Sequence, residues 1–163
     1  MIRFVATFCY TGLLRPAPGT WGSAAACLTA WPIHALGGPL ALVLATATLL
    51  AAGYWASERY MAATGTHDPS EITVDEAVGQ WIALFPVSWG AAHSGADVAA
   101  LWPGVLSAFL LFRLFDIWKP GPIGWADRQP GAWGVMLDDV AAGWIASLLV
   151  AVLAFVFHGV LGL

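Results

Sequence analysis

Two pairs of adjacent acidic residues are the part of the sequence best suited to chemistry. Asp75-Glu76 and Asp138-Asp139 each stand at the predicted start of a helix, next to an apolar stretch. Hard divalent cations such as Mg²⁺ prefer oxygen ligands and commonly take one or two carboxylates together with substrate phosphate. An acid in a first turn can instead complement the helix dipole, and one acid of a pair can cap the helix. Because a cap needs only one carboxylate, two such pairs at one predicted depth favour a metal site.

Three further charged residues follow at the end of another predicted helix. Arg113, Asp116 and Lys119 are spaced three apart, which places them on roughly one helix face. Arg and Lys are suited to binding phosphate, and Asp116 could orient Arg113 or join the metal site. The structural alternative is that these cations only snorkel to a membrane interface. We interpret Asp127-Arg128, in the next loop, as a structural ion pair.

Polar residues near the N-terminus and in one loop add weaker signals. Residues 19–23 form a glycine-spaced turn into a helix, where free N–H groups attract anions and the hydroxyls of Thr20 and Ser23 could help bind phosphate. The turn is not a Walker motif, because the Gly-Lys-Ser/Thr ending is missing. Among the histidines, His67 is the acid–base candidate because it stands beside Asp68, although solvation in a loop is its simpler role.

The elements that must position these residues are apolar helices. Of the 163 residues, 60% are hydrophobic and 10% are charged, against about 25% charged in soluble domains. The ten Trp residues also favour a membrane protein, because Trp is enriched at the interface between a bilayer and water. The length favours one domain, residues 1–163, and the absence of a basic tract argues against a nucleic-acid partner. We therefore predict an all-α, polytopic membrane bundle.

About four to five membrane-embedded helices are expected. Gly37-Gly38-Pro39 should break the chain between the first two, Pro32 could kink the first, and Gly79 could let another helix approach closely. A short interfacial helix is expected within residues 3–14. The longer helices are predicted at residues 21–36, 40–60, 73–89, 97–118 and 138–158, with Ser70 as an alternative start of the third. Thr20 is the expected cap of the first, and a loop is expected over residues 123–137.

The basic residues predict the orientation. With a cytoplasmic N-terminus and five crossings, all six bases and nine of the ten acids lie on one side, as the positive-inside rule requires. The acidic helix starts, the 113–119 helix end and the Thr20 turn then meet at one membrane face. That arrangement suits an active site for a lipid headgroup.

Four blocks of sequence resemble the phosphatidylglycerophosphatase A family. They occur in the family's order within about residues 12–150, and the resemblance departs from the family pattern at residues 130–134 and between Pro120 and Pro122. The blocks are residues 17–23 (APGTWGS), 72–79 (ITVDEAVG), 112–123 (FRLFDIWKPGPI) and 134–139 (GVMLDD).

The resemblance implies a Mg²⁺-dependent phosphatase of the bacterial inner membrane that converts phosphatidylglycerophosphate to phosphatidylglycerol. The family's polar positions also fall on Asp68 and Asp127. Together with the reasoning above, it assigns three overlapping sets. The catalytic set is Asp75, Glu76, Asp116, Lys119 and Asp139; the phosphate-binding set is Thr20, Ser23, Arg113 and Lys119; the metal set is Asp75, Glu76, Asp138 and Asp139.

Two functions outside enzymology stay open at this point. A small cation carrier would need acids deep within the spans or at both faces, and only Asp97 lies opposite. A structural membrane subunit would leave Thr20, Asp75, Lys119 and Asp139 scattered in the fold. A metal-activated water attacking a phosphomonoester fits the residues better, and which carboxylate acts as the base stays open.

Overall fold

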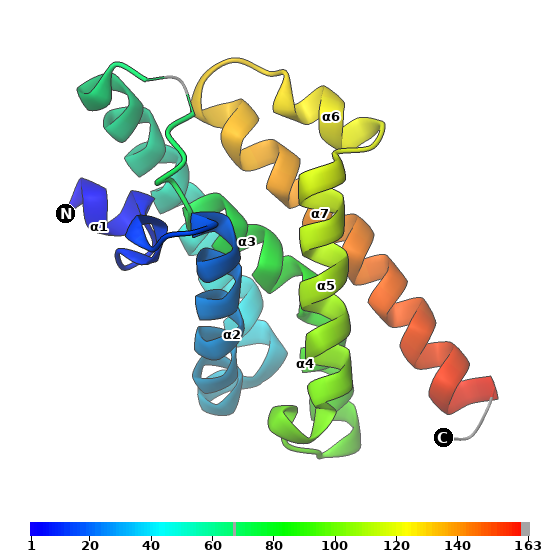
Figure 1. The fold of residues 1–163 in the computed structure, drawn as a ribbon. Coiled ribbons are helices and arrows are strands. Elements are labelled where there is room, and N and C mark those ends of the chain that lie inside the picture. The colour runs from blue at the N-terminus through cyan, green and yellow to red at the C-terminus, as the bar shows by residue number, and fades with distance from the viewer. Residues whose placement is uncertain (67, 161–163) are drawn as a thin grey trace.

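A computed structural model describes residues 1–66 and 68–160, with side chains up to residue 157, and His67 lies outside the described residues. Within them the fold is all-α, with no strand, as the sequence predicts (Figure 1). The elements are α1 (Ile2–Ala6), a 3-10 turn (Thr11–Leu13), α2 (Pro18–Thr64), α3 (Val74–Ala83), α4 (Phe85–Ser94), a second 3-10 turn (Val98–Leu101), α5 (Trp102–Trp118), α6 (Pro122–Asp127), α7 (Gly131–Ala154) and a π-helical end (Phe155–Val160).

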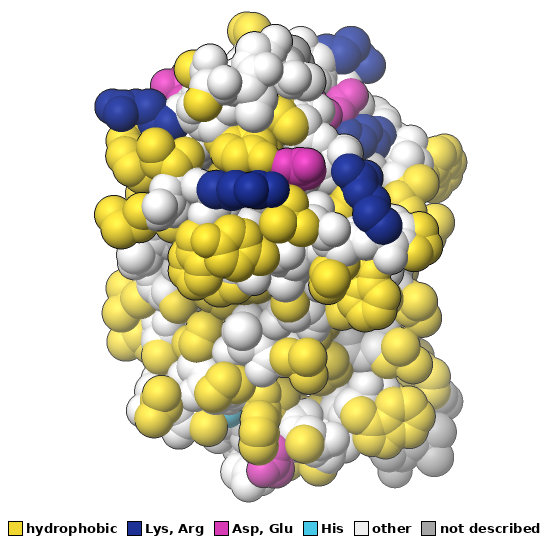
Figure 2. Space-filling model, turned by 60° about the vertical axis from the view of Figure 1, so that its left-hand side comes forward, with side chains coloured by type: hydrophobic (Ala, Val, Ile, Leu, Met, Phe, Trp, Pro, Cys, Tyr) yellow, Lys and Arg dark blue, Asp and Glu magenta, His cyan; other side chains and the backbone are white. Residues whose placement is uncertain are grey.

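Three helical segments are long and apolar enough to cross a membrane. They are Pro18–Thr64, Val98–Trp118 and Gly131–Phe157. Figure 2 shows the corresponding surface: the Lys, Arg and most acidic side chains of the visible face lie toward one end, and hydrophobic side chains cover much of the rest. Apolar side chains exposed in this way fit a lipid environment, because lipid rather than protein would cover them.

The longest helix, α2, is a hairpin of two legs. Gly37 and Gly38 have non-helical backbone angles, and Gly38 has a φ of +65° that favours glycine. Figure 1 shows the two legs side by side, the first in blue and the second in cyan. The predicted break at this point is confirmed. Pro32 produces no such departure from helical angles, so the kink expected there is not seen.

Several helix boundaries differ from the predictions. Residues 73–89 form two helices rather than one, because Leu84 ends α3 and Pro86 opens α4, where a missing N–H is tolerated. The predicted loop 123–137 contains α6 and the start of α7, so Asp138 and Asp139 are interior helix residues and not N-caps. The first leg of α2 begins at Pro18, so Thr20 lies in its first turn and is not the cap.

The centre of the bundle is α3, which packs against α2 and α7. Every residue of α3 except Glu76 is buried. A Cβ added to Gly79 would lie 2.6 Å from the carbonyl oxygen of Asp139, and one added to Gly143 would collide with the backbone of Gly79. The close approach predicted for Gly79 is therefore confirmed, and its partner helix is α7.

Candidate metal and phosphate site

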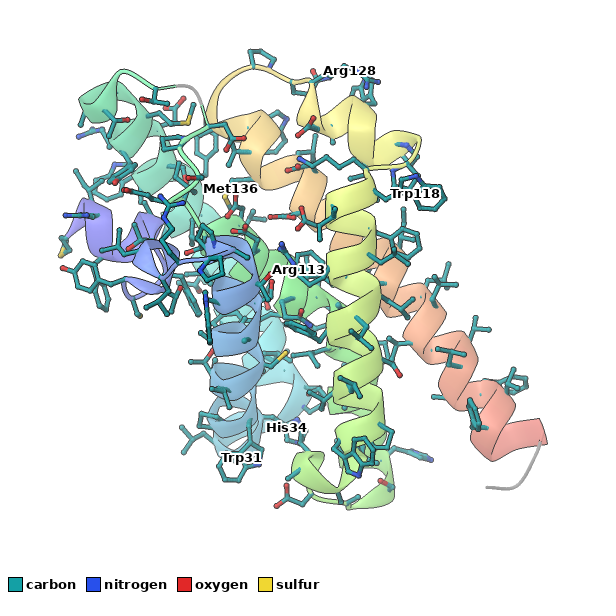
Figure 3. All side chains as sticks on the ribbon, viewed as in Figure 1. Trp31, His34, Arg113, Trp118, Arg128 and Met136 are labelled. Atoms are coloured by element: carbon teal, nitrogen blue, oxygen red, sulfur yellow. The ribbon has the colours of Figure 1, made fainter. Side chains whose placement is uncertain are left out.

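A cavity of about 360 Å³ opens at the end of the bundle where α2 and α3 begin and α5 ends. Figure 3 places Arg113 beside the start of the first leg of α2 and close to α3 and α5, whereas Trp31 and His34 lie near the other end of that leg. The wall is mostly polar. It consists of Pro18, Gly19, Asp68, Ser70, Ile72, Asp75, Glu76, Asp116, Lys119, Asp127, Val135, Asp138 and Asp139.

The crossing of α3 and α7 brings the two acidic pairs together. Asp75 lies one turn before Gly79, and Asp139 lies one turn before Gly143, so each pair is one turn from the point of closest approach. Since both crossing residues lack a side chain, the helix axes can come close enough for carboxylates of both helices to share one space. The structure therefore brings the two acidic pairs together, as the sequence predicts.

The carboxylates form two sets of three. One oxygen from each of Asp75, Glu76 and Asp139 lies within 4.8 Å of the others, and the same holds for Asp116, Asp138 and Asp139. Asp139 belongs to both sets. All the ligand atoms are carboxylate oxygens, which is the donor type that Mg²⁺ prefers.

Several of these oxygens are buried without a hydrogen-bond partner. They are Oε2 of Glu76, Oδ1 of Asp138 and Oδ1 of Asp139. Burying an unpaired carboxylate oxygen is costly, and a bound cation removes that cost. The donor set and the unpaired oxygens therefore fit a divalent cation.

Two bases border the acidic sets. Nη1 of Arg113 lies 2.6 Å from Oδ2 of Asp116 and 3.9 Å from Oε1 of Glu76. Nζ of Lys119 donates to Asp127 and, at 2.6 Å, to Oδ2 of Asp138. These contacts hold positive charge next to the carboxylates, where it can also meet an incoming phosphate.

Lys119 reaches the acids because the chain leaves the helix at this residue. It follows the last residue of α5 with a φ of +48°, so it does not continue the face that carries Arg113 and Asp116. Its partner Asp127 is the acid that the sequence assigned to Arg128. Within the described part of the chain no ion pair joins Asp127 and Arg128, so that interpretation was wrong.

The start of α2 contributes backbone atoms, and no hydroxyl group, to the wall of the cavity. Gly19 lines the cavity, and an added Cβ would lie 3.0 Å from Nη1 of Arg113 and would collide with Glu76. Ser23 is fully buried, and its hydroxyl donates to the carbonyl oxygen of Gly19 at 2.9 Å. Thr20 is half-buried in the first turn, and neither hydroxyl residue is part of the cavity wall.

The environment shifts the pKa of Lys119, which lies just beyond the end of α5. Burial alone would lower this pKa, but hydrogen bonds to Asp127 and Asp138 outweigh it and raise the pKa. Lys119 therefore keeps its positive charge beside the carboxylates.

Sequence reasoning missed part of the wall. Ser70, Ile72 and Val135 line the cavity, and the sequence analysis places none of them in the site. Ser70 stands two residues after Asp68 in a polar loop, which is the one signal that could have found it. Ile72 and Val135 are ordinary apolar residues without a distinguishing pattern. Asp68 and Asp127, carried over by resemblance alone, do lie in the wall.

Comparison with known proteins gives consistent matches over most of the chain. A family model described as phosphatidylglycerophosphatase A matches residues 4–154. A phosphatidylglycerophosphatase A of Haemophilus influenzae is 36% identical over 141 residues, which cover 86% of this chain and 80% of that protein. The Escherichia coli K12 protein of the same name is 31% identical over 156 residues, covering 91% and 78%.

A third relative carries a different name. It is a putative phosphatidylinositol-3-phosphatase of Bacteroides thetaiotaomicron, 38% identical over 144 residues that cover 86% of this chain and 85% of that protein. All three names describe enzymes that remove a phosphate from a lipid headgroup. No solved structure matches the chain.

Proposed function

Because the chain belongs to the phosphatidylglycerophosphatase A family, we propose that its acidic cavity binds Mg²⁺ and is the place where phosphatidylglycerophosphate loses its terminal phosphate. The phosphatidylglycerophosphatase activity itself follows from membership of the family. The products are phosphatidylglycerol and phosphate. The assignment of this chemistry to the cavity is argued from the residues that line it.

One observation carries the proposal: the cavity wall combines buried carboxylate oxygens that have no partner with the base Lys119, and Arg113 lies directly behind Asp116 and Glu76. The unpaired oxygens of Glu76, Asp138 and Asp139 supply negative charge for a cation, and Arg113 and Lys119 supply positive charge for a phosphate. A phosphomonoesterase needs both, since the reacting phosphoryl group carries negative charge that increases locally in the transition state.

The residues would divide the work as follows. Asp75, Glu76, Asp138 and Asp139 hold the ion, and Asp116 orients Arg113 or joins them. Arg113 and Lys119 bind the phosphate oxygens. Thr20 assists from the first turn of α2, and Ser23 acts as a positioning residue because its hydroxyl is bonded to the Gly19 carbonyl.

The reaction transfers the phosphoryl group to water. When bound, the divalent ion supplies Lewis-acid polarisation of the phosphoryl oxygens and lowers the pKa of water. The water oxygen forms a bond to phosphorus, and the bond from phosphorus to the glycerol oxygen breaks. The water proton passes to one of the carboxylates and from there to the departing glycerol oxygen, which leaves as the hydroxyl of phosphatidylglycerol. Arg113 and Lys119 neutralise charge on the phosphoryl oxygens, and Lys119 is suited to this because its pKa is raised.

The membrane arrangement is part of the proposal. The site end, where the visible Lys and Arg side chains gather, faces the cytoplasm, as the positive-inside rule favours. The two legs of α2, the α3–α4 segment, α5 and α7 then form the membrane-embedded bundle of a bacterial inner-membrane protein. The headgroup of a lipid in the inner leaflet would reach the cavity from the interface.

The two alternatives outside enzymology are supported less well. A cation carrier needs ligands along a path, yet the acidic cluster is confined to one end, and Asp97 at the other end is exposed. A structural subunit would have scattered polar residues, yet Asp75, Lys119 and Asp139 line one cavity, and of the four residues compared Thr20 alone is not part of its wall.

The test is phosphate release by the purified protein from phosphatidylglycerophosphate in mixed micelles. We expect release that depends on Mg²⁺, stops in excess chelator and returns when Mg²⁺ is restored. Phosphatidylinositol 3-phosphate, the substrate named for the Bacteroides relative, serves as the second substrate and should be hydrolysed more slowly. Full release in excess chelator would contradict the metal assignment, and faster release from the inositol lipid would contradict the substrate.

A further inference from the structure

The acidic sets contain more ligand oxygens than one Mg²⁺ commonly takes from a protein. Seven carboxylates line the cavity, five of them lie in candidate metal clusters, and a Mg²⁺ ion with substrate usually needs one or two carboxylates. The five do not form one cluster. They form two triads: triad A is Asp75, Glu76 and Asp139, and triad B is Asp116, Asp138 and Asp139.

Each triad has its own unpaired buried oxygen. In triad A this is Oε2 of Glu76, and in triad B it is Oδ1 of Asp138. Asp139 is 3% exposed, belongs to both triads and also has an unpaired Oδ1. A carboxylate has two oxygens with about four lone-pair positions, so one residue can serve two cations. Each triad therefore has an unpaired oxygen of its own, and the shared residue Asp139 has another. This is the distribution expected if the cavity contains two cation sites that share one ligand.

The two triads differ in the positive charge that already faces them. In triad B, Asp116 is paired with Arg113 and Asp138 is paired with Lys119, both at 2.6 Å. In triad A the one basic contact is Arg113 to Glu76 at 3.9 Å, as far as the described residues show. Triad A is therefore the less neutralised set and should attract a cation more strongly.

We propose that the cavity binds two divalent cations, one at each triad, with Asp139 as the shared ligand. The proposal rests on the metal-dependent function proposed above and extends it. Triad A fills first, because its acids lack close basic partners. Triad B fills when a phosphate is present, since the phosphate draws Arg113 and Lys119 away from Asp116 and Asp138 and frees those carboxylates for the second cation. Two-metal sites of this kind stabilise both the attacking and the leaving oxygen of a displacement.

The test uses Mn²⁺ as the probe, with inorganic phosphate, on the full chain in detergent. Equilibrium dialysis should give one tightly bound Mn²⁺ per chain without phosphate and two with it. Electron paramagnetic resonance should then show a spin-coupled pair, because ions in two-metal sites lie about 3.5–4 Å apart. Asp116→Asn should hold one uncoupled Mn²⁺ with or without phosphate.

Two further variants complete the experiment: one changes the other triad, and one is a control outside the cavity. Glu76→Gln weakens the other triad and should lower the affinity for the first Mn²⁺, so it gives an answer even where Asp116→Asn does not fold. Asp97→Asn is the matched control, because Asp97 is an exposed acid at the opposite end of the bundle, and it should bind two coupled ions with phosphate.

The outcomes separate the two proposals. One Mn²⁺ per wild-type chain at saturation with phosphate would overturn the two-cation inference while leaving the proposed function intact. Two coupled ions in Asp116→Asn would overturn the assignment of triad B. A chain that binds no Mn²⁺ and releases phosphate in chelator would contradict the proposed function itself.

Discussion

The two ends of the bundle both carry acidic residues, but they satisfy them differently. At the far end, Oδ1 of Asp97 accepts hydrogen bonds from the Ala99 N–H at 2.8 Å and from Nε1 of Trp31 at 3.2 Å, and Asp97 is exposed. At the site end, Asp138 and Asp139 are buried, and each has an oxygen without a partner. A carboxylate that is exposed to solvent and accepts hydrogen bonds needs no cation to stabilise it. Burying a carboxylate oxygen without a partner costs free energy, which a bound cation can offset. The difference identifies the end at which a cation is needed.

The largest effect is expected when one negative charge is removed from the site end of the bundle. Asp75→Asn keeps the shape of the side chain but removes the negative charge of a buried ligand. We expect phosphate release to fall by at least about 100-fold, on the scale of losing one group that stabilises the transition state. Circular dichroism in detergent should show an unchanged helical content. Activity within a few-fold of wild type would contradict the role given to Asp75.

The next largest effect is expected from the bases. Lys119→Met leaves Asp127 and Asp138 without the ammonium group that now contacts both. We expect a loss of about 10–100-fold in kcat/KM with part of the effect in KM, because Lys119 binds substrate phosphate as well as neutralising the acids. Arg59→Met is the control, since Arg59 stacks over Trp55 and lines no part of the cavity. Equal losses in both variants would show a general charge effect instead.

The crossing of α3 and α7 offers a test that changes no polar group. Gly143→Ala adds one methyl group where the backbone of Gly79 leaves no room, so the helices must separate. Overpacking of this kind costs about 1–3 kcal/mol, and we expect a lower Tm and a loss of about 10-fold in activity as the acidic pairs move apart.

Gly90→Ala is the matched control for that variant. Gly90 lies in α4 with open space around it, and its backbone φ is not positive. The same chemical change should therefore leave Tm and activity close to wild type. If Gly143→Ala behaves in the same way, the close crossing does not set the site geometry.

The smallest effect is expected at the far end. Asp97→Asn retains an N-cap side chain and removes one exposed charge. Phosphate release should stay within about two-fold of wild type, which is the range of ordinary surface substitutions. A large loss in a steady-state assay would show that the far end takes part in the reaction, and it would favour a carrier over an enzyme.

The sequence was sufficient to predict which acids meet and that Lys119 joins them, but not how they are held together. Charge clustering and the four sequence blocks predicted the convergence of Asp75, Lys119, Asp138 and Asp139, and Gly37-Gly38-Pro39 predicted the turn of the α2 hairpin. These signals are local in the chain. They depend on residue type and spacing, which a single sequence displays.

The features that were missed depend on tertiary packing. Residues 131–137 are poor in helix signals, yet they are helical because α7 packs against α3 and α6, and packing overrides propensity. The left-handed conformation of Lys119 and its pairing with Asp127 arise where α5 meets α6. The sharing of Asp139 between two triads is a three-dimensional relation with no trace in sequence spacing.

The most direct measurement is the anomalous scattering of Mn²⁺ in crystals of the protein. The account predicts anomalous density inside the cavity, coordinated by carboxylates of both α3 and α7, with Asp139 among the ligands. Density that is absent at saturating Mn²⁺, or that lies outside the cavity while Asp75, Glu76 and Asp139 stay unliganded, would contradict the claim that these helices cross in order to build a cation site.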